Sequence, residues 1–216
     1  MPDHLAGKGL MRRLAGTPAS RYQRQIGVFD LHERRSLLHR DIDASVCRDA
    51  GLFDEYFEQN GLDVVSTCQR VDQHTYLPDD ILVKVDRASM RSSLETRIPF
   101  LDHRLVEMVN TLPWEMKIRG GTQKHILKQL ARQVVPAEIL SAPKRGFGVP
   151  LKYWLRDELN NFARDLLLSP SRQSDRLLDR SAVATLLDNH DRGGRDLSDR
   201  IWSLLVFEQW CRCFNV

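Results

Sequence analysis

Long apolar segments are missing from this 216-residue sequence, in which no run approaches the roughly 18 residues that a membrane-spanning helix needs. The N-terminal stretch is basic but has no apolar core before a small-residue cleavage site, so it does not predict a secretory signal. Cysteine is also scarce, and the four cysteines form no C-x-x-C pair and no zinc-type pattern with histidine. We therefore expect a cytoplasmic protein with free thiols, no metal-ligand cluster and no membrane partner.

A strong excess of one charge is missing too. Lysine and arginine number 32 against 29 aspartate and glutamate residues, which leaves a net charge of +3. This charge is too small to indicate a nucleic-acid partner. The composition, with 42% hydrophobic and 28% charged residues, is that of an ordinary globular protein, and the length allows one large domain or two small ones.

Strand-type alternation is scarce, whereas helical periodicity recurs along the chain. Helices are predicted at residues 30–39, 51–60, 63–77, 79–92, 103–112, 123–135, 151–168, 180–190 and 198–213. Asp30 and Glu33 have the spacing of a capping box at the start of the first of these helices. The tryptophans lie on apolar helix faces and are predicted to be core residues: Trp114, Trp154, Trp202 and Trp210. We expect one mainly α domain, with two lobes that part near residues 141–150 as the alternative.

The segment YLPDDILVKVDRASMRSSLETRIPFLDH, residues 76–103, packs many charges among apolar residues. A helix over 79–92 is apolar nearly all round, which is typical of a buried helix. Lys84 and Asp86 would then point into a core or a cleft, where unpaired charges cost several kcal/mol. Two interpretations stay open: structural ion pairs, such as Asp80 with Lys84 across one turn, or a cleft that binds a ligand.

Two further groups of charged residues stand out. Glu95, Arg97 and Asp102 are predicted to form a structural network that fixes the link between two helices, with substrate contact as the alternative. The loop KRGFGVP, residues 144–150, sets Lys144 and Arg145 beside Gly146. Glycine permits close approach by a ligand, and a lysine there could neutralise phosphate oxygens. Its alternative is a solvated turn in which the glycines only shape the chain.

Together, residues 76–103 and 144–150 resemble the C-terminal part of the synthetase domain of glutamine-hydrolysing asparagine synthetases. That family carries a run close to LxxKxDRxSMxxSLExRxPFLD, followed by a Lys-Gly-Phe-like loop that ends in proline. The resemblance is best over residues 76–168. It implies a PP-loop ATPase fold, of the adenine-nucleotide α-hydrolase-like type, in which a nucleotide-binding α/β sheet precedes a helical region. This chain matches the helical region and lacks the sheet.

The resemblance also implies a reaction. The family uses ATP and Mg²⁺ to activate aspartate as β-aspartyl-AMP, with release of pyrophosphate, and ammonia from glutamine then gives asparagine. By this likeness Lys144 is expected to be catalytic. Lys84, Asp86, Arg145 and Gly146 are expected to bind nucleotide or substrate.

Three family elements are not found in the 216 residues: the SGGxDS loop of the ATP site, the GEGADE-like acidic segment and the N-terminal cysteine that hydrolyses glutamine. Gly-Gly occurs only in RGGTQK and DRGGRD, and position 2 is proline. We therefore expect residues 1–216 to be one helical portion, without a glutaminase domain, that is inactive without upstream PP-loop and glutaminase regions. A homodimer stays open. The alternatives are an amide or lactam synthetase for another carboxylate, or a non-catalytic helical module that binds a partner.

Overall fold

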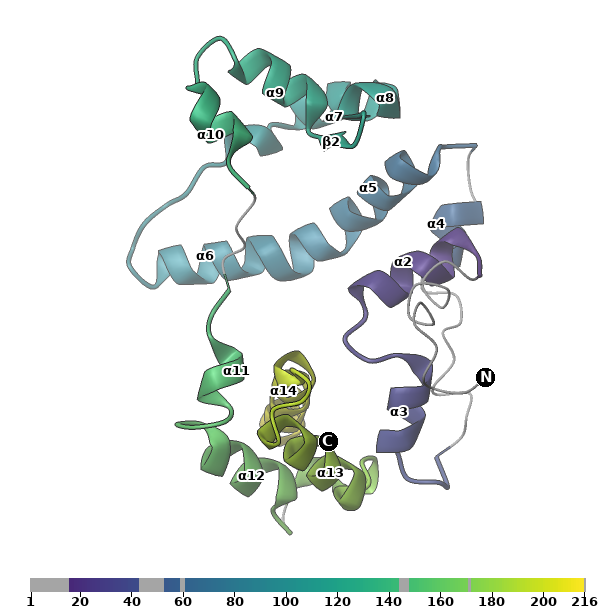
Figure 1. The fold of residues 1–216 in the computed structure, drawn as a ribbon, viewed down its shortest axis with the longest axis vertical. Helices are drawn as coiled ribbons and strands as arrows, with labels where there is room; N and C mark the ends of the chain where they lie inside the picture. Colours follow the sequence, from purple (N-terminus) through teal and green to yellow (C-terminus); the bar gives the residue numbers. More distant parts are fainter. Residues whose placement is uncertain (1–15, 43–52, 59–60, 144–147, 171, 216) are drawn as a thin grey trace. The chain divides into compact units, whose positions relative to one another are not determined.

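The computed structural model describes residues 16–42, 53–58, 61–143, 148–170 and 172–215, and most of them are helical (Figure 1). The chain divides into two units: residues 1–50 with 147–216 form unit 1, and residues 51–146 form unit 2. One boundary between the units falls after residue 146, inside the 141–150 loop. The alternative interpretation of the sequence placed the division between two lobes in this loop. The described strands make up a single two-stranded sheet, so the mainly α prediction is confirmed.

Unit 1 consists of helices from both ends of the sequence. They are α2 (Pro18–Ile26), α3 (Leu31–Leu37), α11 (Leu151–Trp154), α12 (Asn160–Leu168), the 3₁₀ helix η4 (Gln173–Arg176), α13 (Arg180–Asp191) and α14 (Ser198–Phe214). Their buried side chains form one apolar core of Leu37, Leu155, Ala163, Leu166, Leu167, Leu178, Val183, Leu187, Ile201, Leu204 and Leu205. Residues 37–39 join this core by pairing with 177–179, through an antiparallel bridge between Leu38 and Leu178.

The start of α3 follows the sequence closely. The Asp30 carboxylate accepts from the Glu33 backbone N–H at 2.8 Å, and the Glu33 carboxylate accepts from the Asp30 backbone N–H at 3.1 Å. The predicted capping box is therefore confirmed. Glu33 also pairs with Arg200 of α14 at 2.8 Å, so the residues of this cap connect α3 to α14.

Asp30→Ala is expected to lower the free energy of unfolding of unit 1 by about 1 kcal/mol, because the Glu33 backbone N–H in the first turn of α3 loses its side-chain acceptor. Urea unfolding of the two proteins measures the difference. His32→Ala, at an exposed position on the same helix, is the matched control and should change stability by less than about 0.5 kcal/mol. Equal losses in the two variants would show that the cap contributes nothing.

Unit 2 contains α4 (Asp54–Glu58), α5 (Val64–His74), the π-helix η2 (Leu77–Leu82), α6 (Val83–Met90), the 3₁₀ helix η3 (Pro99–Leu101), α7 (His103–Thr111), α8 (Trp114–Lys117), α9 (His125–Ala131) and α10 (Ala137–Ser141). A short hairpin of β1 (Ile118–Arg119) and β2 (Thr122–Gln123) joins α8 to α9. Few of its side chains are buried: of the described residues, Thr67, Val71 and Lys117. Among the described residues, none of the helices in either unit has both the length and the apolar character needed to cross a membrane.

Three sequence expectations were wrong in detail. The helix predicted over 151–168 is two helices, since residues 155–159 form turns. The helix predicted from residue 123 starts at His125, because Thr122 and Gln123 belong to the hairpin. The tryptophans are not core residues, since Trp114, Trp154, Trp202 and Trp210 are exposed by 38%, 37%, 45% and 50%. Their helices are short or pack by the opposite face, so the large rings remain at the surface.

Candidate functional site

The helix that carries Lys84 and Asp86 is continuous with a π-helix. Pro78 lies in the first turn of η2, where its missing N–H costs no hydrogen bond, and η2 runs directly into α6. Asp79 and Asp80 occupy that same first turn, as the sequence predicted, and their negative charge suits the positive end of the helix dipole. A π-helical segment is uncommon and is often found at functional sites.

Lys84 and Asp86 are both exposed, and the prediction that their helix is buried was wrong for this chain. The Lys84 Nζ lies 3.5 Å from the Asp80 carboxylate, and the two side chains are 61% and 51% exposed. No residue of α6 is buried, and Val83 and Met90 are exposed together with the charges. The apolar character is real, but no described part of unit 2 covers it.

The three residues expected to form one network divide into two local pairs. Glu95 pairs with Arg97, and both are largely exposed. Asp102 pairs with Arg104, which donates from Nε at 3.0 Å and from its terminal nitrogen at 2.8 Å to the two carboxylate oxygens. Asp102 also caps α7 by accepting from the Arg104 backbone N–H at 3.0 Å. The Arg104 guanidinium holds the pKa of the Asp102 carboxyl below its usual value.

Lys144, Arg145 and Gly146 lie outside the described residues, so the structure does not place the predicted catalytic loop. For the other predicted site residues, the structure shows contacts only with residues that lie close to them in the sequence. Among the described residues, no three His, Cys, Asp or Glu side chains gather as metal ligands. Lys84 and Asp86 are open to solvent, so the described residues of unit 2 do not enclose them.

A concavity of about 270 Å³ lies in unit 2 between α8 and α9. It is lined by Glu115, Met116, Arg119, His125, Ile126 and Gln129, none of which was among the predicted site residues. The hairpin that folds α8 back onto α9 turns at Gly120 and Gly121, with φ of +54° and +76°. A Gly-Gly pair is typical of a two-residue hairpin turn, because both turn residues adopt positive φ. This pair is therefore the feature of the sequence that could have predicted the hairpin beside the concavity.

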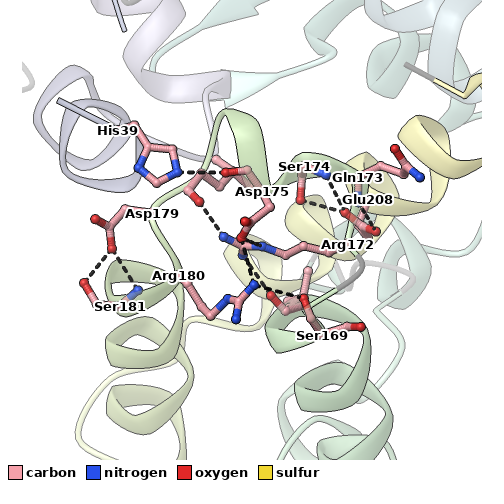
Figure 2. A network of polar contacts seen from close by, with 12 residues as sticks. His39, Ser169, Arg172, Gln173, Ser174, Asp175, Asp179, Arg180, Ser181 and Glu208 are labelled. Carbon is pink, nitrogen blue, oxygen red and sulfur yellow. Dashed lines mark hydrogen bonds and ion pairs between the residues drawn. The ribbon is translucent and has the colours of Figure 1, made fainter. Parts of the chain in front are cut away.

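A cluster of buried charges lies in unit 1, around η4 (Figure 2). The Arg172 side chain is fully buried and donates to the carbonyl oxygens of Leu167 and Leu178, and to the Asp175 carboxylate at 2.9 Å. The fully buried Glu208 of α14 accepts from the backbone N–H groups of Gln173 and Ser174, each at 3.0 Å. These charges are saturated with partners, which is typical of a structural clamp on the 169–179 loop.

Two more groups donate hydrogen bonds to the Glu208 carboxylate, and they favour its ionised form. The Ser174 hydroxyl donates at 2.6 Å and the Arg212 Nε donates at 2.7 Å. Burial raises the pKa of the Glu208 carboxyl, but hydrogen bonds from Ser174, Arg212 and Gln173 outweigh burial and lower that pKa below its usual value. Glu208 is therefore an ionised carboxylate that holds η4 and the end of α14 together.

Comparison with known proteins gives the family. The model of the asparagine synthase family matches residues 4–212. Asparagine synthetase [glutamine-hydrolyzing] 1 of Bacillus subtilis is 33% identical over 211 residues, which are 97% of this chain and 33% of that relative. A putative asparagine synthetase [glutamine-hydrolyzing] of Mycobacterium tuberculosis is 36% identical over 223 residues, 99% of this chain and 32% of that relative. The human asparagine synthetase [glutamine-hydrolyzing] is 38% identical over 82 residues, 37% of this chain and 14% of the human protein.

No solved structure matches this chain. The chain spans about one third of the length of the two bacterial relatives. The family model, by contrast, covers nearly the whole of the chain, and the two bacterial relatives align along almost all of it. This chain belongs to the asparagine synthase family.

Proposed function

We propose that this chain is the helical C-terminal portion of an ATP-dependent carbon–nitrogen ligase that makes asparagine. The observation that carries the proposal is the family match over residues 4–212 together with a span of one third of the bacterial relatives. The complete enzyme would activate the side-chain carboxylate of aspartate with ATP and Mg²⁺, release pyrophosphate and pass the β-aspartyl-AMP to ammonia released from glutamine.

The exposed surface of unit 2 supports the proposal that another protein segment packs against it. It exposes many large apolar side chains, among them Met90, Leu94, Phe100, Met108, Leu130, Val134 and Ile139. Exposed apolar surface on this scale marks a contact site for another protein segment. We assign that contact to the nucleotide-binding and glutaminase portions, which would supply the SGGxDS loop, the acidic segment and the N-terminal cysteine that these 216 residues do not contain.

In the complete enzyme, Lys144 is assigned to the phosphate end of the ATP site, where its cation would neutralise charge that develops on the leaving pyrophosphate. Arg145 and Gly146 would border the same phosphates. Lys84 and Asp86 extend from α6 on the exposed side of unit 2, where an incoming domain can enclose them. A synthetase that acts on another carboxylate is the second candidate, because nothing in the described residues selects aspartate.

The isolated 216-residue chain is expected to release no pyrophosphate from ATP and aspartate, because a lysine cannot catalyse adenylation without groups that position the nucleotide. The measurement is pyrophosphate release with the chain alone, and with the chain joined to upstream segments of a bacterial relative. Turnover by the isolated chain would overturn the assignment as a portion. Turnover by the joined protein with a carboxylate other than aspartate would favour the second candidate.

A further inference from the structure

The short connection between α13 and α14 is held in place by side chains that reach its backbone. It comprises residues 192–197, which include two adjacent glycines, and Gly193 has a positive φ of +82°. The Arg156 guanidinium donates from Nε to the His190 carbonyl at 2.9 Å, and from a terminal nitrogen to the Arg195 carbonyl at 3.4 Å. Since glycine leaves the backbone free to adopt other conformations, the observed form of the connection depends on such contacts.

The His190 side chain holds the end of this connection at the start of α14. The ring is fully buried, and the Leu197 backbone N–H donates to its Nδ1 at 3.1 Å. A backbone N–H can only donate, so this bond requires a neutral imidazole whose proton is on Nε2. The Leu197 carbonyl in turn accepts from the backbone N–H groups of Arg200 and Ile201, each at 3.1 Å. The neutral ring therefore positions the first turn of α14.

A second proton on the His190 ring would break the contact with Leu197. A proton on Nδ1 would face the Leu197 N–H, donor against donor, and would remove the acceptor of that bond. The buried Nε2 has no hydrogen-bond partner among the described residues, so no carboxylate there compensates a positive ring. Burial disfavours the charged form, and the Arg156 guanidinium acts in the same direction, so the pKa of His190 lies below its usual value.

The neighbouring groups that favour a charged ring are engaged elsewhere. They are the carboxylates of Asp191 on α13 and Asp196 in the connection, and the Lys152 backbone of α11, which leaves Nε2 without a hydrogen bond. Asp191 accepts from Arg164 of α12 at 2.6 Å. Asp196 accepts from the Ser198 backbone N–H at 3.1 Å and from the Ser198 hydroxyl at 2.7 Å. These bonds use the carboxylates to fix α12, α13 and α14, and burial of the ring outweighs their charge.

Helices α3 and α14 add one more group of charges beside the connection. Glu33 of α3 pairs with Arg200 of α14 at 2.8 Å and with Arg195 of the connection at 3.6 Å. Opening of the connection would therefore part Arg195 from Glu33. The apolar core formed by the described residues of unit 1 contains no residue of 192–197, so the connection can open while that core stays packed.

We propose that His190 is an acid-sensitive latch, which holds the 192–197 connection against the start of α14 while its ring is neutral and lets the connection open when Nδ1 takes up a proton. This inference does not depend on the proposed catalytic function. In the open form the ring meets water and has its usual pKa, about 6.5. Because the pKa is lower in the closed form, the closed form is fully favoured above about pH 6.5 and loses this advantage as the pH falls toward the lower value. The carboxyls of Asp196 and Glu208 have lowered pKa values and stay ionised in this range.

Hydrogen exchange of the Leu197 amide in the 216-residue chain, followed from about pH 7 to about pH 5, tests the proposal. After correction for the intrinsic exchange rate, the protection factor of this amide is expected to fall about tenfold or more, because each open molecule is held open by protonation of His190. Amides of α12, which belongs to the core of the same unit, should change by less than about twofold. An unchanged protection factor at Leu197, or an equal fall in α12, would overturn the proposal.

A pair of histidine variants assigns the effect to His190. His190→Asn offers an amide oxygen in place of Nδ1 and does not titrate, so the protection of the Leu197 amide should no longer depend on pH in this range. His32→Asn removes an exposed histidine from α3 of the same unit and should keep the pH dependence of the parent. A dependence that persists in His190→Asn, or that disappears in His32→Asn, would contradict the assignment.

Nitrogen NMR of the imidazole ring needs no variant. In the parent chain at about pH 7, the His190 ring should be neutral with a bare Nδ1. A proton on Nδ1 should appear only as the Leu197 amide loses its protection. If Nδ1 carries a proton at about pH 7, or gains one while the Leu197 amide stays protected, the ring does not act as a latch and the proposal fails.

Discussion

Glu208→Ala is expected to lower the free energy of unfolding of unit 1 by about 3–5 kcal/mol. The side chain is fully buried, and its removal leaves the backbone N–H groups of Gln173 and Ser174 and the Ser174 hydroxyl without an acceptor. The Arg212 guanidinium loses its partner at the same time. Hydrogen exchange of amides in α13 and α14 reports unit 1 separately from unit 2 and measures the loss.

Two further variants separate the network from simple loss of volume. Glu208→Gln keeps the shape and one acceptor oxygen, so it should cost less than the alanine variant. Glu158→Ala removes an exposed carboxylate from the same unit and should change stability by less than about 0.5 kcal/mol. If Glu208→Ala also cost less than about 1 kcal/mol, the network around η4 would not be a clamp.

The same carboxylate predicts a pH dependence. The pKa of Glu208 is lower in the folded state than its usual value, so its stabilisation is complete above the usual pKa and is lost as the pH falls through the lower folded value. Unit 1 should therefore lose stability below about pH 4. The loss should be smaller in Glu208→Gln, although the lowered pKa values of Asp175 and Asp179 leave part of it in place. Identical acid profiles for the two proteins would contradict this assignment.

Local signals in the sequence predicted the ends of several helices. Asp30 was expected to begin a helix with a capping box, and its carboxylate accepts from the Glu33 backbone N–H at the start of α3. The starts of α13 and α14 were also predicted, because a polar loop precedes each long apolar periodicity. Capping depends on residues within one turn, so sequence order alone is enough to predict it.

Tertiary contacts explain what the sequence could not show. The chain turns at residues 155–159 without proline or glycine, because Asn160 donates to the Leu155 carbonyl at 3.0 Å and to the Asp191 carboxylate at 2.9 Å. Arg156 donates to the His190 carbonyl at 2.9 Å in the same region. Asp191 is 31 positions from Asn160, and His190 is 34 positions from Arg156. Periodicity within 151–168 therefore predicted a single helix where distant residues interrupt it.

The candidate site was predicted from the family pattern more than from periodicity. The apolar surroundings of Lys84 indicated a helix covered by apolar partners, but α6 has no buried residue in this chain, so another domain would have to supply that cover. Conversely, no pattern in the sequence indicated that Arg172 and Glu208 would both be buried around η4. They are separated by 36 positions, and the gap 169–178 had the polar composition of an ordinary loop. Only the fold brings their partners together (Figure 2).

Lys144→Ala, in the complete enzyme that contains this segment, is expected to slow pyrophosphate release by about 10²–10³-fold. The reason is that a fixed cation stabilises the charge that develops on phosphate oxygens more in the transition state than in the bound substrate. The rate constant should therefore fall more than the affinity for ATP. Lys144 lies outside the described residues, so this expectation depends on the family pattern of residues 144–150 and on the chemistry of its ammonium group.

Two matched variants make the result specific. Lys144→Arg keeps the positive charge but replaces a compact ammonium with a planar guanidinium, so it should retain part of the activity. Lys152→Ala removes a cation close by in sequence, whose Nζ lies 5.8 Å from the Tyr153 ring centroid, and should leave turnover unchanged. Circular dichroism would show whether each variant folds. Unchanged pyrophosphate release in a folded Lys144→Ala enzyme would remove Lys144 from the reaction, and the binding of a partner through the exposed faces of unit 2 would then be the better account of this chain.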